Sequence, residues 1–225
     1  MSRTAFAFLA LVTICGCKSS PEMKPTAGAV EYEVTFTGMW TAQTHPLEYP
    51  KAGVVTGPHF SGLIGTTHGD GYALIREGMS PTRGLERLSE EGKHSPLDDE
   101  IRQAIARGQA GRLIETDPIR DMSKPMTARF TVDEKFPMVS AVAMIAPSPD
   151  WFAGAPAVNL RPNGEWVETV EVMMNAWDSG GDNGTTYEAP DDDANPKGNT
   201  MLNESKHFVQ EGRRVPVARL TFRKL

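Results

Sequence analysis

The sequence predicts an all-β fold, an antiparallel β-sandwich with one or two short helices. One segment alternates strictly between apolar and polar residues, and several short apolar segments are bounded by Pro, Gly and Asp. The 21 glycines and 17 prolines supply the many turns that such a fold needs. With 225 residues and 39% hydrophobic content, the chain is long enough to bury the core of a single sandwich domain.

The alternating segment is residues 31–37, where Tyr32, Val34 and Phe36 are separated by Glu and Thr. This period of two is typical of a strand with one buried face. The region 38–70 is rich in Gly, Pro, His and Thr, so we expect long loops with short extended pieces there. Further strands are expected, from β-branched and apolar content, at residues 72–76, 127–132, 138–146, 166–175 and 215–222.

One helix of about a dozen residues is expected after Ser95 and Pro96. Ser95 is a candidate cap, and the acids at positions 98–100 complement the positive end of a helix dipole. Leu97, Ile101 and Ile105 recur every four residues, and Gly108 is a typical helix terminator. The helix should therefore pack on the sandwich through one apolar stripe.

The N-terminus has the features of a secretion signal, with Arg3 followed by an apolar run over residues 5–14. Ten apolar residues are too few for a permanent membrane helix. Residues 11–17, ending in Cys15-Gly16-Cys17, resemble the lipobox of bacterial lipoproteins. The resemblance implies a signal peptide at 1–16, a lipid on Cys17, a polar tether at 17–28 and a folded domain at 29–225. A soluble secreted protein stays open as the alternative, because Cys15 is an unusual residue at its lipobox position.

The charge balance excludes nucleic acid as a partner, because the formal net charge is −6 and no Lys/Arg cluster is present. Removal of residues 1–16 takes away Arg3 and makes the net charge −7. It also leaves no cysteine for a disulfide, so stability must come from the core or from a bound ion. Lys18 follows the lipidated cysteine, which favours anchoring in the outer membrane.

Three aspartates follow two of the expected strands. Asp150 comes just after the strand at 138–146, and Asp178 and Asp182 come just after the strand at 166–175. If both strands end on the same side of the sandwich, three carboxylates meet and a divalent cation would relieve their repulsion. Glycines at positions 180, 181 and 184 would let the backbone turn sharply around the ion. From spacing alone, an Asp-Gly-rich turn without metal is an equally good interpretation.

Several motifs resemble the spondin-domain family of F-spondin and mindin. They are residues 32–40 (Tyr-Glu-Val-Thr-Phe-Thr-Gly-Met-Trp), 44–46, 49–50, 65–68, 145–151 and 177–184, and they follow the family's order over about residues 31–225. The resemblance implies a C2-like antiparallel β-sandwich and one calcium ion bound by Asp150, Asp178 and Asp182. Unlike many animal members, the chain has no cysteine after Cys17 and no thrombospondin repeat.

The resulting expectation is a non-enzymatic, calcium-binding, lipid-anchored envelope protein that acts in adhesion or recognition of a protein or glycan. A first alternative is a C2-like phospholipid-binding module in which Trp151 and Phe152 insert into the membrane interface. A second is a hydrolase that uses an Asp or Ser near the ion, and a third is a purely structural envelope role. No catalytic residue is predicted, because the common nucleophile and phosphate-binding motifs are absent.

Other conspicuous residues are better explained without a site. The run from Asp178 to Gly181 resembles the nucleophile segment of chymotrypsin-like proteases, but the motif expected around a base histidine is absent. Residues 188–204 are expected to form a solvated acidic loop rather than a second ion site at 191–193. A structural role is expected for the histidines and tryptophans, namely His45, His59, His68, Trp40, Trp151, Trp166 and Trp177.

Overall fold

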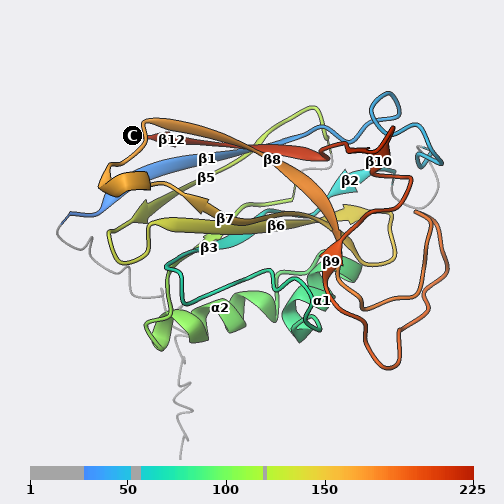
Figure 1. Ribbon diagram of the computed structural model, residues 1–225, viewed down its shortest axis with the longest axis horizontal. Coiled ribbons are helices and arrows are strands. Elements are labelled where there is room, and N and C mark those ends of the chain that lie inside the picture. The colour runs from blue at the N-terminus through green and yellow to red at the C-terminus, as the bar shows by residue number, and fades with distance from the viewer. Residues whose placement is uncertain (1–27, 52–56, 119–120) are drawn as a thin grey trace, which may run out of the picture.

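The computed structural model describes residues 28–51, 57–118 and 121–225. It contains a ten-stranded antiparallel sheet that folds over into two layers, with two helices packed below the lower layer (Figure 1). The predicted all-β sandwich with short helices is confirmed. The predicted signal peptide, Cys17 and all of the tether except Gly28 lie outside the described residues. Among the described helices, none has the length and apolar character needed to cross a bilayer.

The helices are α1 (Arg83–Glu91) and α2 (Leu97–Ala106), and a short 3-10 turn η1 spans Pro162–Gly164. The long strands are β1 (Val30–Gly38), β5 (Met126–Val132), β6 (Met138–Ala146), β7 (Trp151–Asn159), β8 (Thr169–Asp178) and β12 (Ala218–Lys224). The shorter strands are β2 (His59–Phe60), β3 (Ile64–His68), β4 (Ala110–Glu115), β9 (Met201–Leu202), β10 (Val209–Gln210) and β11 (Arg213–Arg214).

Strand β8 joins the two layers. The sheet order is β4-β3-β6-β7-β8-β12-β1-β5, so β8 has β7 on one side and β12 on the other. Its first part, residues 169–174, pairs with β12 in the upper layer. Its last part, residues 175–178, pairs with the start of β7 in the lower layer. The strand therefore crosses from one layer to the other before it ends at Asp178 (Figure 1).

Two hydrophobic cores result from this arrangement. The larger core lies between the layers and contains Tyr32, Phe36, Trp40, Trp151 and Phe222, all at most 2% exposed. The second core lies between the lower layer and the helices and includes Leu85, Leu88, Leu97, Ile101 and Phe152. The lower layer is thus covered on both faces, whereas the upper layer has one face in solvent.

The strands marked by alternation or by a long run of apolar residues were predicted well. Residues 31–37 lie in β1, 127–132 in β5 and 138–146 in β6, while the segments expected at 166–175 and 215–222 overlap β8 and β12 with shifted ends. The expected strand at 72–76 is wrong: these residues form bends, and the adjacent Leu74 and Ile75 are both buried in the helix-side core. Strands β4 and β7 were missed, and β3 lies in the region 38–70, where only short extended pieces were expected. All five residues of β3 are buried, so that strand shows no alternation.

The helix predicted after Ser95 is confirmed as α2, but its predicted cap is wrong. The N-cap position is occupied by Pro96, and no side chain caps the helix. Helix α1 was not predicted, although its boundaries have local signals. Thr82 accepts a hydrogen bond from the Leu85 N–H at the N-terminus, and Gly92 ends the helix with a positive φ of 66°.

Candidate functional site

The topology brings the two aspartate-bearing turns to one edge of the lower layer. Strands β6 and β8 are both antiparallel to β7, so they run parallel to each other and end at the same edge. Asp150 lies in the turn between β6 and β7, and Asp178 is the last residue of β8. Trp151 is the backbone partner of Asp178 in the sheet. The condition set by the sequence, that both strands end on the same side, is fulfilled.

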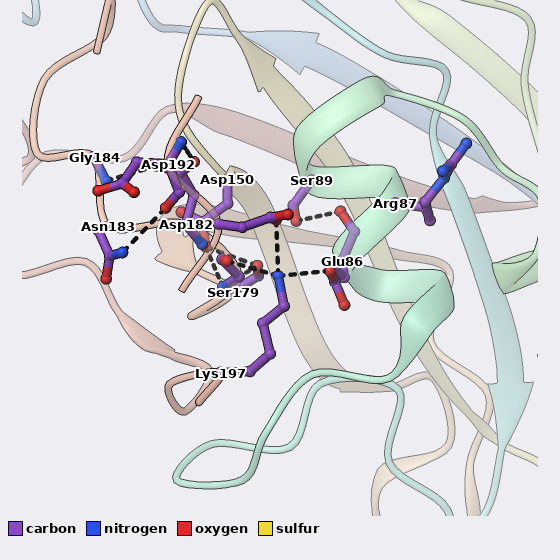
Figure 2. Close-up of polar contacts among 12 residues, drawn as sticks. Glu86, Arg87, Ser89, Asp150, Ser179, Asp182, Asn183, Gly184, Asp192 and Lys197 are labelled. Atoms are coloured by element: carbon purple, nitrogen blue, oxygen red, sulfur yellow. Dashed lines mark hydrogen bonds and ion pairs between the residues drawn. The ribbon is translucent and has the colours of Figure 1, made fainter. Parts of the chain in front are cut away.

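Asp150 is the centre of this edge. Its side chain is 0% exposed. Its Oδ2 accepts hydrogen bonds from the Ser179 hydroxyl at 2.9 Å and from the backbone N–H groups of Gly181 at 2.7 Å and Asp182 at 3.2 Å (Figure 2). Its Oδ1 is also buried and has no hydrogen-bond partner among the described residues. Oδ2 of Asp150 therefore stabilises the turn of residues 179–182, and Oδ1 accepts no hydrogen bond from the described residues.

Asp178 and Asp182 stabilise the same turn through their own backbone contacts. Asp178 Oδ1 accepts from the Gly180 N–H at 2.9 Å. Asp182 accepts from the Gly184 N–H at 2.6 Å and from the Asp192 N–H at 2.7 Å, which connects the turn to the acidic loop. Gly180 adopts a φ of 82°, and a Cβ there would lie 2.6 Å from the Gly198 carbonyl carbon, so this position requires glycine.

The predicted ligands share an edge but do not converge on one point. Within the described residues, the group of acids whose oxygens all lie within 4.8 Å of one another is Glu86, Glu90 and Asp193, not the three predicted aspartates. Coordination of one ion by Asp150, Asp178 and Asp182 together would therefore require side-chain rotation. The aspartates are hard oxygen donors on neighbouring turns, which is the ligand type that calcium prefers.

Burial and mutual repulsion dominate the electrostatics of the edge. Burial raises the pKa of the Asp178 carboxyl to about 6, and the nearby charge of Asp150 adds to the effect. Burial also raises the pKa of Asp150, against the opposing effect of hydrogen bonds from Ser179, Gly181 and Asp182. Both carboxylates are thus less stable in the charged form than in water, which is the situation that a nearby cation would relieve.

Helix α1 adds acids that the sequence did not indicate. Glu86 and Glu90 lie one turn apart on α1 and face the acidic loop. Together with Asp182, Asp191 and Asp193 they line a groove of about 580 Å³. This acidic groove lies between α1 and the turns at the edge of the sheet, so its acids come from three separate segments of the chain.

Lys197 already supplies a cation to this groove. Its Nζ lies 2.9 Å from Glu86 Oε1, 3.0 Å from Asp193 Oδ1 and 2.9 Å from the Gly181 carbonyl oxygen (Figure 2). The hydrogen bond with Glu86 is the main reason that the pKa of Lys197 is raised. The ammonium group bridges the helix, the acidic loop and the turn that follows Asp178.

Glu90 lies in the groove without a contact to Lys197 among the described residues. Its Oε1 is buried without a hydrogen-bond partner among the described residues. A Cβ on Gly181 would lie only 2.6 Å from that oxygen, so the carboxylate is pressed against the turn. Burial and the charge of Glu86 raise the pKa of Glu90 to about 7. Sequence reasoning missed Glu90 because it did not predict α1, although the i, i+4 spacing of Glu86 and Glu90 was visible.

The structural interpretations of the other conspicuous residues agree with the structure. Ser179 is 0% exposed and donates its hydroxyl to Asp150, so it does not have the accessibility of a nucleophile. His45 and His68 are buried and contact the backbone oxygens of Val215 and Gly69. Trp40, Trp151 and Trp177 are at most 5% exposed.

The lipid-insertion alternative is wrong in the form stated above. Trp151 is 1% exposed and belongs to the core between the layers, and Phe152 is 0% exposed and belongs to the helix-side core. Neither side chain is available to enter a membrane interface. The two residues alternate between opposite faces of β7, as successive residues of a strand do.

Comparisons with known proteins identify the family of the chain. The family model described as Spondin_N matches residues 30–212. Spondin-1 from Rattus norvegicus is 32% identical over 170 residues, which is 72% of this chain and 20% of that protein. Spondin-2 from Rattus norvegicus is 31% identical over 160 residues, which is 71% of this chain and 48% of that protein. The chain thus spans about a fifth of Spondin-1 and about half of Spondin-2. On the match to residues 30–212, more than half of its length, the chain belongs to the Spondin_N family.

Proposed function

We propose that the chain binds one divalent cation, calcium by preference, at the edge formed by Asp150, Asp178 and Asp182. The observation that carries the proposal is Asp150 Oδ1, a buried carboxylate oxygen with no partner among the described residues. A buried oxygen of this kind is costly unless a proton or a cation completes its bonding. Calcium coordinates carboxylate and carbonyl oxygens in flexible geometry, so it suits a rim of aspartates on loops.

The ion would act mainly on the turns. When bound, it supplies positive charge that offsets the repulsion between Asp150 and Asp178. The turn of residues 179–182 and the acidic loop are already connected through Asp182. Fixing Asp182 would therefore order both segments together, and the surface that they form would be complete only in the ion-bound state.

At the level of the whole protein, we infer a role in adhesion or recognition of a protein or glycan outside the cytoplasm. Membership in the Spondin_N family supports this inference, as does the signal-like N-terminus. The proposed anchor is a lipid on Cys17, which would place the rim at a membrane surface, with the outer membrane favoured. The proposed role is non-enzymatic, and the hydroxyl of Ser179 is buried and donated to Asp150.

Thermal unfolding in calcium and in chelator tests the cation site. We expect calcium to raise the melting temperature, because an ion at 100 times its Kd stabilises the folded state by about 2.7 kcal/mol. Asp178→Asn should remove most of the shift while the sheet stays intact, because an amide oxygen can still accept from the Gly180 N–H. Asp191→Asn, in the exposed part of the loop, is the matched control and should keep the shift. An equal melting temperature with and without calcium in the unmodified chain would contradict the site.

A further inference from the structure

A second hollow lies on the other side of the helix pair. It is a cleft of about 450 Å³ between the segment of residues 70–76 and helix α2. Leu97, Glu100 and Ala104 of α2 line it together with the C-cap residue Arg107, and their spacing of three and four residues places them on one side of the helix. Leu97 and Ala104 are buried, so they form an apolar floor, and the polar residues lie around the rim.

Two arginines line this cleft without a carboxylate partner. Arg76 donates its Nε–H to the Ala73 carbonyl at 3.4 Å, and Arg107 donates its Nε–H to Gln109 Oε1 at 2.9 Å. Within the described part of the chain, neither guanidinium forms an ion pair. Their terminal N–H groups therefore remain free to bind something else.

Two acids, Asp70 and Glu100, also line the cleft and balance its formal charge, but neither forms an ion pair with Arg76 or Arg107 among the described residues. Glu100 accepts the Gly84 N–H through its Oε1 at 2.8 Å, which connects α2 to the start of α1. Asp70 is exposed. The terminal N–H groups of both arginines are therefore open toward a ligand.

Tyr72 places a hydroxyl between the charged groups. Its ring packs against the ring of His68, with centroids 5.7 Å apart, so the side chain is held in place. Burial raises the pKa of the Tyr72 hydroxyl and the charge of Glu100 adds to the effect, while Arg76 and Arg107 act in the opposite direction. The amides of Gln103 and Gln109 add further hydrogen-bonding groups to the lining.

We propose that this cleft binds a small polyhydroxylated ligand that carries one oxyanion, a carboxylate, sulfate or phosphate group. Arg76 and Arg107 would hold the oxyanion, because a guanidinium offers parallel N–H donors that match two oxygens. Tyr72, Gln103 and Gln109 would hydrogen-bond the hydroxyl groups, and the floor of Leu97 and Ala104 would take the apolar face of the ring. The volume is within the usual range for small-molecule sites.

The test uses four sugars with the same body: glucose, glucuronate, glucose 6-sulfate and glucose 6-phosphate. Binding is followed by ligand-observed NMR and by calorimetry at low salt, in chelator, so that the result is independent of the cation site. At least one anionic sugar should bind at least about tenfold more tightly than glucose, the size of effect expected from charge-assisted hydrogen bonds. Which of the three binds best identifies the oxyanion.

Variants distinguish binding in the cleft from nonspecific attraction of anions to the protein surface. Arg76→Gln and Arg107→Gln should each weaken the best anion about tenfold or more, a typical effect of losing one charge-assisted pair. The matched control is Arg102→Gln, because Arg102 is also on α2 but pairs with Glu115 at 3.5 Å. It removes the same charge and should leave affinity unchanged. Melting temperatures of the variants check that each is folded.

Three results would overturn the proposal. The first is that no anionic sugar binds at about 10 mM, a concentration that corresponds to a binding free energy of about 3 kcal/mol. The second is that glucose and the anionic sugars bind equally well. The third is that the double variant Arg76→Gln/Arg107→Gln binds as well as the unmodified chain. A cation site that fails its own melting test would leave this proposal intact, because the two sites share no residue.

Discussion

The two hollows beside the helix pair handle charge in opposite ways. In the acidic groove beside α1, the carboxylates are crowded and partly buried, and Lys197 brings a positive charge from within the chain. In the cleft beside α2, the exposed Arg76 and Arg107 form no ion pair among the described residues, although Asp70 and Glu100 also line the cleft. The groove should therefore control stability, while the cleft should contribute little to stability and show its charges mainly in binding.

The largest expected effect is at Asp150. Asp150→Ala removes the acceptor of three buried donors, so we expect a loss of about 3 kcal/mol in the free energy of unfolding. Asp150→Asn keeps an acceptor oxygen and should cost only about 1 kcal/mol. Urea unfolding in chelator measures both variants. Arg107→Gln, from the cleft, is the control and should stay within about 0.5 kcal/mol of the unmodified chain.

Equal losses for the Ala and Asn variants of Asp150 would show that the turn does not depend on the acceptor oxygen. A large loss for Arg107→Gln would show that the cleft, too, is part of the stabilising structure. Either result would break the contrast between the two hollows.

Lys197 tests whether the groove is balanced from within. Lys197→Met removes the contacts with Glu86, Asp193 and the Gly181 carbonyl, and leaves the acids to repel one another. We expect the free energy of unfolding to fall by about 1 to 2 kcal/mol at pH 8 and low salt, because a partly buried network of charges is stronger than an exposed pair. High salt should reduce the difference, because mobile ions screen the repulsion. Lys206→Met, at an exposed position, is the control and should change little.

Glu90 gives the smallest effect but the clearest pH dependence. Its pKa in the folded chain is about 7, above the ordinary value of 4.5. The folded state therefore holds the proton more tightly, and this stabilisation is present below about pH 4.5 and is lost as the pH rises through 7. Glu90→Gln cannot ionise, so it should equal the unmodified chain near pH 5 and exceed it by about 1 kcal/mol at pH 8, after allowance for solvent screening.

Chemical unfolding across this pH range, in chelator, measures the Glu90 effect. Glu91→Gln is the matched control from the same helix. Its hydrogen bond with Lys93 lowers the pKa of Glu91, so the control should gain no stability at high pH. If the stability of Glu90→Gln and that of the unmodified chain change in parallel with pH, the pKa of Glu90 is not raised in the folded state.

The sequence predicts the strands that are marked by alternation or by a long run of apolar residues, and it misses those that have neither signal. β1 alternates because its outer face is in solvent, and its bounds were predicted almost completely. β3 is buried on both faces, and β7 contains Ala153, Gly154, Ala155 and Pro156, residues with little strand preference. Only the neighbouring strands and the helix layer explain why these segments are extended.

The candidate site divides in the same way. The turns that bear Asp150, Asp178 and Asp182 could be predicted, because each directly follows a strand whose end is visible in the sequence. The proximity of Glu90 and Lys197 could not, because it depends on how α1 packs below the sheet. The local sequence pattern therefore predicted the three aspartates, whereas the position of Glu90 and Lys197 beside them follows only from tertiary packing.

The crossing of β8 between the layers has a consequence for how the domain opens. Residues 169–174 of β8 pair with β12 in one layer, and residues 175–178 pair with β7 in the other. Separation of the layers must therefore disrupt the backbone pairing of β8 between residues 174 and 175. Amide hydrogen exchange in the two layers should therefore proceed through one shared opening rather than two independent ones. Any ligand that fixes the end of β8 at Asp178 would then slow exchange as far away as β1, at the opposite side of the fold.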